Sequence, residues 1–333
     1  MTFKIKKYIY YIFIFVALSF ASLWGVQHFF KLSVDFNKLN VSLVVTLIGM
    51  ILIYVLLDAL RFYWILKIMN VHIRYREVIK LAMVGTSVSN ITPFLAGGSI
   101  AQIYLLHKQN VEIGNATAAT SVRAVLASTF FFTILPIVFY FNDGILGDLG
   151  LEIGQYLPII SVVYVIWTVA IIVVTFKHER FLKGLTRFSK RFIDPKRAER
   201  TTAELLSFFE GMRQFLTSGF KNIAIALLTT SIHFTFIFFF SSAIVKAFGY
   251  QYSIFKVAAY QMMVHFVMYF GFTPGATGFA EGSFAYIFSK VVSPDDLALV
   301  VFLWRASTVY IVTILGFFIL IIEVYRYRTR RIS

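Results

Sequence analysis

The chain has 333 residues, of which 59% are hydrophobic and 14% are charged, and its mean hydropathy is +0.79. Globular proteins carry about 25% charged residues, so this composition excludes a soluble domain and predicts a polytopic helical membrane protein; with no cysteine, disulfides and thiolate chemistry are excluded as well. The formal net charge is +15, and the positive residues lie between apolar segments, which favours the anionic cytoplasmic leaflet as their partner over nucleic acid.

Six apolar segments are long enough to cross a bilayer, because a helical span needs about 20 residues. A cleaved signal peptide also begins with positive residues, but its apolar core has only about 7–15 residues. The first segment, preceded by Lys4, Lys6 and Lys7, is therefore interpreted as an uncleaved helix with its N-terminus in the cytoplasm. The predicted spans are Tyr8–Phe30, Leu39–Leu66, Asn115–Phe141, Gly154–Phe176, Phe220–Phe248 and Leu297–Tyr325.

Two further apolar segments, at 78–106 and 255–291, are broken by Thr-Pro and glycines. Proline interrupts a helix, and backbone groups freed inside a bilayer must be buried in protein or line a wet cavity. If both segments crossed, the basic segment 177–219 would lie outside and the acidic loop 142–153 inside, against the positive-inside rule. If both return to the side they entered, every basic segment and both termini fall in the cytoplasm. We therefore predict two re-entrant hairpins.

Residues 177–219 form the longest polar segment, with ten Lys and Arg against five Asp and Glu. The spacing of its apolar residues predicts two amphipathic helices that lie on the cytoplasmic surface, with a turn at Asp194-Pro195.

The two halves of the chain repeat one pattern in opposite orientations. Residues 1–141 and 220–333 each contain a span, a hairpin and a helix with one arginine, and 142–219 joins them with a span and the basic segment. The separation from Pro93 to Arg123 is 30 residues, and that from Pro274 to Arg305 is 31. We predict one all-α membrane domain over 1–333, with six transmembrane helices, two re-entrant hairpins and an inverted-topology repeat, as in secondary transporters.

The run from Thr273 to Glu281 reads Thr-Pro-Gly-Ala-Thr-Gly-Phe-Ala-Glu, and a degenerate copy, Asn90-Ile-Thr-Pro93 followed by Gly97-Gly98, stands in the first hairpin. The pair resembles the Pro-x-x-Gly-Gly-x-Gly-x-x-Glu type signature of the lysylphosphatidylglycerol synthase/flippase transmembrane region family, over nearly the whole chain. The resemblance implies a multi-pass protein of a bacterial or archaeal cytoplasmic membrane that moves lipid between leaflets.

Three features depart from that family. Full-length members continue into a soluble aminoacyl-transferase domain, whereas this chain stops after its last span. Ala276 and Thr277 replace one of the expected glycines, and Ser99 stands where the first motif is often acidic. These departures leave the predicted fold intact and leave the lysyl substrate open.

The predicted substrate-binding residues are of two kinds. Arg123 and Arg305 are predicted to bind a phosphate through charge-assisted, bidentate contacts, and Glu281 to pair with them or to receive a lipid amine. The alternative reading is that Glu281 and Arg305 neutralise each other and hold the second hairpin in place. The hairpin turns contribute backbone donors and glycines that need unusual backbone angles or close approaches: Asn90, Thr92, Gly97, Gly98, Thr273, Gly275 and Gly278.

Two further polar features lie on the apolar spans. Asp58 and Arg61, three residues apart on one helix face, are predicted to form a structural ion pair or a secondary substrate contact. His233 and His265 are interpreted as hydrogen-bonding residues at helix interfaces.

We expect a lipid flippase-like transporter with no catalytic residues, metal or cofactor. Its expected partners are membrane phospholipids with an anionic or aminoacylated headgroup. The sequence leaves open whether the protein forms a homo-oligomer. One alternative is the membrane part of a phosphatidylglycerol lysyltransferase that acts with a separate catalytic chain, because 177–219 is too small to hold an aminoacyl-tRNA site. Another alternative is an ion or small-solute channel.

Overall fold

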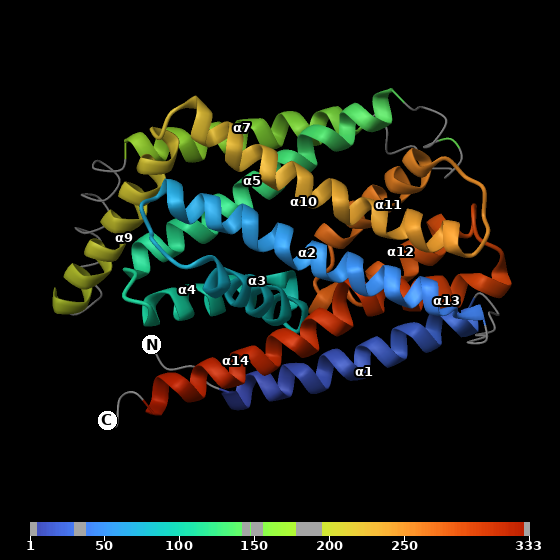
Figure 1. Ribbon diagram of the computed structural model, residues 1–333. Helices are drawn as coiled ribbons and strands as arrows, with labels where there is room; N and C mark the ends of the chain where they lie inside the picture. The colour runs from blue at the N-terminus through green and yellow to red at the C-terminus, as the bar shows by residue number, and fades with distance from the viewer. Residues whose placement is uncertain (1–4, 30–37, 142–146, 148–155, 178–194, 330–333) are drawn as a thin grey trace.

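The computed structural model describes residues 5–29, 38–141, 147, 156–177 and 195–329, and the regular elements within them are helices. Figure 1 shows a bundle in which most long helices run in roughly the same direction, with both termini at one end. In chain order the elements are α1 (Ile5–Phe29), α2 (Val41–Ile68), α3 (Tyr75–Asn90), η2 (Pro93–Leu95), α4 (Gly97–Lys108), α5 (Ile113–Tyr140), α7 (Leu157–Phe176), α9 (Pro195–Leu216), α10 (Phe220–Ala247), α11 (Ile254–Tyr269), η4 (Pro274–Ala276), α12 (Phe279–Phe288), α13 (Pro294–Arg305), η5 (Ala306–Tyr310) and α14 (Ile311–Thr329).

Six helices of the described residues are long and apolar enough to cross a membrane, which confirms the prediction of an all-helical polytopic membrane protein. The last of them joins α13, a five-residue π-helical turn (η5) and α14 into one continuous span. The acidic loop at 142–153 and the first amphipathic helix expected within 177–194 lie outside the described residues, apart from Gly147 and Lys177. The six candidate spans are Tyr10–His28, Val41–Ile68, Ile113–Tyr140, Pro158–Phe176, Phe220–Ala247 and Pro294–Arg326.

Two of the helices, α2 and α13, begin at residues suited to the first turn of a helix. The side chain of Asn40 accepts a hydrogen bond from the Leu43 amide at the start of α2, which satisfies one of the amides that a helix leaves free. Pro294 occupies the first position of α13, where a missing N–H costs nothing, and Asp295 and Asp296 follow it in the first turn. The helices α2, α5 and α10 each have 28 residues, about 42 Å of helix.

Each broken segment forms a pair of shorter helices that pack against each other. The first pair is α3 and α4, joined by the turn η2, and the second is α11 and α12, joined by η4. Helix α3 has 16 residues and measures about 24 Å, less than the thickness of a hydrocarbon core of about 30 Å. In Figure 1, α3 and α4 lie toward the end of the bundle that carries both termini, and α11 and α12 toward the opposite end.

The two turns contact each other, with η4 buried and Phe94 and Leu95 of η2 exposed. Residues of η2 contact those of η4, and a Cβ built on Gly275 would lie only 2.8 Å from the carbonyl oxygen of Asn90. Each turn contains left-handed backbone, with φ of 54° at Phe94 in the first and 62° at Gly275 in the second. Two buried apolar clusters flank this meeting point: one surrounds α3 and α4, and the other surrounds α11, α12 and α13.

The described part of the basic segment is α9, which packs against α5 and α7. Its apolar residues Phe209, Met212 and Phe215 are buried, and a Glu204 carboxylate oxygen accepts a hydrogen bond from the Gly114 amide at the start of α5. The amphipathic helix expected after Asp194-Pro195 is therefore present, and its apolar face is covered by the bundle.

Candidate functional site

Asp58, on α2, shares its carboxylate between two arginines. Arg61 donates its Nε–H to Oδ1 over 2.7 Å, and Arg123, on α5, donates from Nη2 to Oδ1 over 2.7 Å and to Oδ2 over 2.6 Å. His233, on α10, places its Nε2 atom 3.6 Å from the same Oδ1. We call these four residues the Asp58 cluster; they come from three different spans.

Aromatic rings orient the charged groups of this cluster. The Arg61 guanidinium lies 5.1 Å from the ring centroid of Phe234, and that of Arg123 lies 5.1 Å from the ring of Phe62. Tyr54 stacks on His233 with the ring centroids 5.3 Å apart. Cations over aromatic faces are stabilised electrostatically, so these rings help to hold the two arginines in place.

The Asp58 cluster is neither charge-balanced nor fully hydrogen-bonded. Two guanidinium groups share one carboxylate, which leaves one excess positive charge when His233 is neutral and two when it is protonated. Three buried nitrogen atoms have no hydrogen-bond partner among the described residues: Arg61 Nη1, Arg123 Nε and His233 Nδ1. Buried donors and unpaired charges are costly, so this arrangement favours an anion that supplies both acceptors and negative charge.

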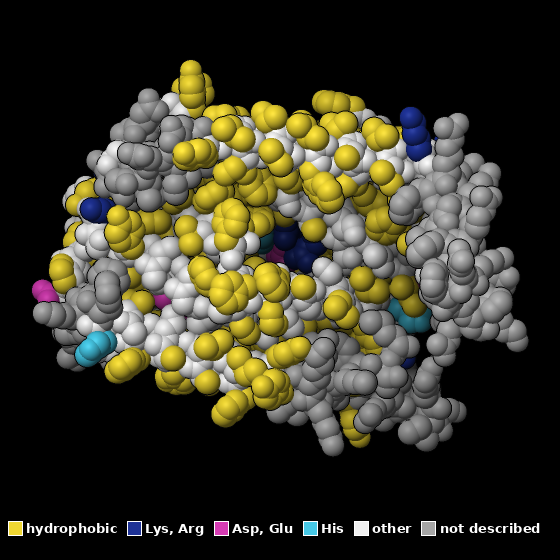
Figure 2. Space-filling view, turned by 180° about the vertical axis from the view of Figure 1, so that it is seen from behind, with side chains coloured by type: hydrophobic (Ala, Val, Ile, Leu, Met, Phe, Trp, Pro, Cys, Tyr) yellow, Lys and Arg dark blue, Asp and Glu magenta, His cyan; other side chains and the backbone are white. Residues whose placement is uncertain are grey.

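Figure 2 shows a hollow in the middle of an otherwise largely hydrophobic face, with Lys or Arg, Asp or Glu, and His side chains on its floor. The Asp58 cluster has this composition, and 14% of the Arg123 side chain is exposed. The other buried ion pair, Glu281 with Arg305, has no exposed surface and cannot contribute to what is visible. The types of charged side chain on the floor of the hollow are those of the Asp58 cluster.

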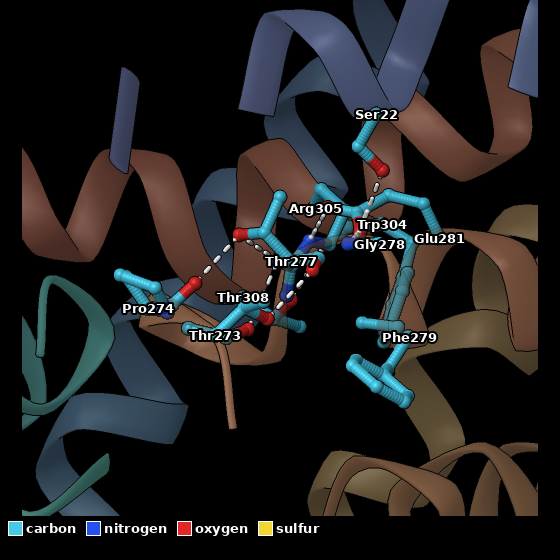
Figure 3. A network of polar contacts seen from close by, with 12 residues as sticks. Ser22, Thr273, Pro274, Thr277, Gly278, Phe279, Glu281, Trp304, Arg305 and Thr308 are labelled. Carbon is cyan, nitrogen blue, oxygen red and sulfur yellow. Dashed lines mark hydrogen bonds and ion pairs between the residues drawn. The ribbon is translucent and has the colours of Figure 1, made fainter. Parts of the chain in front are cut away.

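Arg305, at the end of α13, lies in a sealed and charge-balanced environment. Its Nε–H donates to Glu281 Oε1 over 2.6 Å, and Nη2 donates to the carbonyl oxygen of Gly275 over 3.1 Å. The other Glu281 oxygen accepts hydrogen bonds from the Gly278 amide over 2.7 Å and from the Ser22 hydroxyl over 3.1 Å. Figure 3 shows these groups converging on the second turn from α1, α12 and α13. Both side chains are completely buried.

The predicted residues of the first turn are held mainly by contacts within the protein. Asn90 is buried and donates from Nδ2 to Thr313 Oγ1 over 2.9 Å. The Thr92 hydroxyl donates to the Val88 carbonyl oxygen and accepts from the Gly97 amide over 2.9 Å.

Two of the four predicted glycines, Gly98 and Gly278, are explained by different physical causes. A Cβ on Gly98 would lie 2.1 Å from Ser89 Oγ and 2.3 Å from the Gly85 carbonyl oxygen, so this glycine allows a close helix approach. Gly278 has a φ of +91° with no atom within 4 Å of such a Cβ, so here the backbone angle matters. Thr273, in the second turn, donates its hydroxyl to the Thr277 carbonyl oxygen over 2.7 Å.

The structure brings the predicted residues together in two groups. Arg123 joins Asp58 and Arg61, whereas Arg305 joins Glu281, Gly275 and Gly278. The expected pairings of Asp58 with Arg61 and of Glu281 with Arg305 are observed. His233 was expected only to make hydrogen bonds at a helix interface, and no spacing along the chain connects it to Asp58. Among the described residues no three His, Asp or Glu side chains come together in a way that could hold a metal ion.

Comparison with known proteins places this chain in a family. Residues 9–316 match the family described as "Lysylphosphatidylglycerol synthase TM region". The chain belongs to this family. The resemblance found in the hairpin motifs is thereby confirmed, and the lysylphosphatidylglycerol synthase TM region accounts for nearly the whole length of the chain.

Two relatives of this TM region family come from archaea. A UPF0104 membrane protein of Archaeoglobus fulgidus is 28% identical over 262 residues, which cover 76% of this chain and 78% of the relative. The UPF0104 membrane protein MJ1595 of Methanocaldococcus jannaschii is 25% identical over 307 residues, which cover 90% and 89%. No solved structure matches the chain.

Proposed function

We propose that the protein is a transporter, not an enzyme, that moves a phosphate-headgroup lipid between the leaflets of the cytoplasmic membrane. The observation that carries this proposal is the excess positive charge of the Asp58 cluster at the floor of a hollow in an apolar face. Guanidinium groups with free N–H donors are the side chains best suited to bind phosphate oxygens. Membership of the lysylphosphatidylglycerol synthase TM region family supports a lipid as the cargo.

The hollow suits a molecule with one polar end and two apolar chains. A headgroup crossing the bilayer alone would leave its charge in hydrocarbon, where each unsatisfied polar group is costly. In the hollow, Arg61 and Arg123 can replace the water around the phosphate. The acyl chains meanwhile stay outside, against the hydrophobic side chains that surround the opening in Figure 2. No small soluble ion requires such a combination of surfaces.

We further propose that both helical hairpins are re-entrant and that the two halves form an inverted repeat. Helices α3 and α11 have 16 residues each, too few for a full span. The hairpins approach the middle of the bundle from opposite ends (Figure 1). With both termini and the basic α9 in the cytoplasm, as the positive-inside rule favours, the first hairpin enters from the cytoplasm and the second from outside.

The two arginines are then proposed to act differently. Arg123, with Arg61, binds the phosphate because it belongs to a positively charged cluster and its side chain is partly exposed. Arg305 and Glu281 form the ion pair that holds η4 against α12 and α13, since the hydrogen bonds of both side chains are made to other groups of the protein. Residues of the two turns, such as Thr92 and Gly275, shape the wall between the two sides of the membrane.

Transport is tested with the purified protein in phosphatidylglycerol-containing liposomes that carry a trace of phosphatidylglycerol with a fluorescent acyl chain. A membrane-impermeant reductant should bleach only the outer leaflet of protein-free vesicles but both leaflets of vesicles that contain the protein. Arg123→Gln should abolish the bleaching of the inner leaflet. Arg213→Gln, at an exposed position on α9, is the matched control and should leave transport unchanged.

Two results would count against the proposal. Bleaching that never exceeds the outer leaflet, with protein that is monodisperse and correctly inserted, would show that the protein does not move this lipid. An ionic conductance across planar bilayers without lipid movement would indicate a channel instead.

The re-entrant arrangement has its own test, because the chain has no native cysteine. Single cysteines at Gly147 and Ser293 should react with an impermeant maleimide added outside cells, and a cysteine at Lys190 should not. Reaction of the Lys190 variant from outside would contradict the arrangement.

A further inference from the structure

Negative charge is scarce wherever the described residues could meet a headgroup. Asp58 is the acidic residue of the hollow, and both of its carboxylate oxygens accept hydrogen bonds from arginines. Glu281 is completely buried, and both of its oxygens are bonded as well. The remaining acidic residues whose side chains the structure describes lie on α9, before or in the first turn of a helix, or beside Lys80 near the start of α3: Glu77, Glu112, Glu204, Glu210, Asp295, Asp296 and Glu323.

We infer that the hollow selects a headgroup of net negative charge, a phosphodiester without an added amine, and rejects aminoacylated, cationic headgroups. This inference rests on the proposed function and names its substrate class. The cluster of Asp58, Arg61 and Arg123 carries one excess positive charge, and protonation of His233 would raise the excess to two. Neither state offers a carboxylate that an ammonium group could pair with.

The charge balance separates the two kinds of lipid. A phosphodiester headgroup brings one negative charge, which neutralises the cluster and supplies acceptors for Arg61 Nη1 and Arg123 Nε. Lysyl esterification adds two ammonium groups to that phosphate, so the same headgroup becomes cationic overall. The loaded hollow would then hold two excess positive charges at short range in a medium of low dielectric constant, where such repulsion is weakly screened.

The family name would lead to the opposite expectation, because it refers to a lysyl lipid. We infer a different preference because of two residues of this chain. Ser99 is exposed at the start of α4 and cannot pair with an amine as a carboxylate would. The acidic residue of the second hairpin motif, Glu281, is already committed to Arg305.

Binding of three lipids with identical acyl chains tests the inference: phosphatidylglycerol, phosphatidylethanolamine and lysyl-phosphatidylglycerol, each titrated into the full-length protein in detergent and followed by native mass spectrometry. Phosphatidylglycerol should bind most tightly and the lysyl lipid about tenfold or more weakly, with phosphatidylethanolamine between them. Equal affinities, or tighter binding of the lysyl lipid, would overturn the inference.

A charge-removing variant connects the preference to the cluster. Arg61→Gln removes the excess positive charge, so the ratio between the phosphatidylglycerol and lysyl-lipid affinities should fall several-fold toward one. Arg213→Gln, the exposed control on α9, should keep the wild-type ratio. Arg123→Gln provides a second way to remove the charge if Arg61→Gln is not monodisperse. A ratio that stays at the wild-type value in both cluster variants would show that other groups set the preference.

Two comparisons separate this inference from a site for soluble phosphodiesters and from the proposed transport function. Water-soluble glycerophosphoglycerol carries the same phosphodiester, so competition by it at lipid-like concentrations would indicate a site for soluble phosphodiesters instead of a lipid. Liposome transport of the three lipids separates selectivity from transport. Preferential binding without movement would contradict only the proposed function, whereas equal movement of all three lipids would contradict only the inference on charge.

Discussion

Arg123 and Arg305 each follow a hairpin at almost the same distance along the chain, but their surroundings differ in charge and access. Arg305 has its own carboxylate, Glu281, supplied by the hairpin that precedes it. Arg123 takes its carboxylate from Asp58 on a different helix, α2, and shares it with Arg61. One arginine is thus sealed in a neutral pair, and the other belongs to a positively charged cluster below an opening.

The same sequence pattern of hairpin and arginine therefore stands in two different environments. A hairpin that carries its own acid can be fastened by the arginine that follows it, and the arginine is then no longer available to a ligand. Where the corresponding position is Ser99, the arginine has no partner in its own hairpin.

The sealed pair should show the largest effect on stability. Arg305→Ala should lower the free energy of unfolding by about 3–5 kcal/mol, because Glu281 would stay buried without a cation. Thermal and denaturant unfolding of the purified protein in detergent would measure this. The double variant Glu281→Gln with Arg305→Gln should lose less than Arg305→Ala, since no buried charge is orphaned. If Arg305→Ala is as stable as the wild type, the ion pair of Glu281 and Arg305 does not stabilise the second hairpin.

Glycines of the two hairpins should differ in the reason for their sensitivity. Gly98→Ala should cost about 1–3 kcal/mol, because its Cβ meets the Gly85 carbonyl oxygen, which belongs to the helix backbone. Gly278→Ala should cost about 1–2 kcal/mol through its φ of +91° alone. Gly282→Ala is the control, since Gly282 lies within α12 with no atom within 4 Å and should be neutral or slightly stabilising. Unfolding measurements on the three variants test this distinction. Equal losses of unfolding free energy in all three would refute it.

Removing Arg123, the proposed phosphate ligand, should affect stability less than removing Arg305. Arg123→Gln should cost about 1–2 kcal/mol, because Asp58 keeps its hydrogen bond from Arg61 and the site is partly open to solvent. Measured side by side, Arg305→Gln should be the less stable of the two, while Arg123→Gln should show the larger loss of phosphatidylglycerol binding. A reversed order would exchange the roles of the two residues.

A charged contact near the end of the bundle should matter least. Lys80, on α3, donates to Glu77 and to Glu323 on α14, each over 2.9 Å. Ion pairs that solvent reaches contribute about 0–1 kcal/mol, so Lys80→Gln should shift the unfolding free energy by no more than that. A loss comparable to that of Arg305→Ala would show that this contact is as decisive as the buried pair.

Much of the fold follows from the sequence because a bilayer allows few alternatives. Runs of about 20 apolar residues have to be helices in hydrocarbon, and the six predicted spans agree with the observed ones to within a few residues at most ends. The Thr-Pro and glycine pattern also located both breaks. Both features, the length of an apolar run and a proline or glycine break within it, can be read from neighbouring residues in the sequence.

The composition of the site was harder to predict because it depends on how distant helices pack. The link between Asp58 and Arg61 follows from their spacing on one helix, but that between Asp58 and Arg123 joins residues 65 positions apart. His233 gave no signal beyond being a polar residue in an apolar run. The sequence also could not decide between a ligand role and a structural role for Glu281, because that choice depends on burial, and burial is a property of the folded molecule.

The continuous span from α13 to α14 contacts both hairpins, and it does so on either side of the π-helical turn. Before the turn, Arg305 bonds to the second hairpin; after it, the Val312 carbonyl oxygen and Thr313 Oγ1 accept hydrogen bonds from Ser87 and Asn90 of the first. A π turn contains one residue more than the α-helical turn it replaces, and one residue corresponds to about 100° of rotation around the helix axis. The π turn therefore sets the angle, around the helix axis, between the residue that bonds to the second hairpin and the residues that bond to the first.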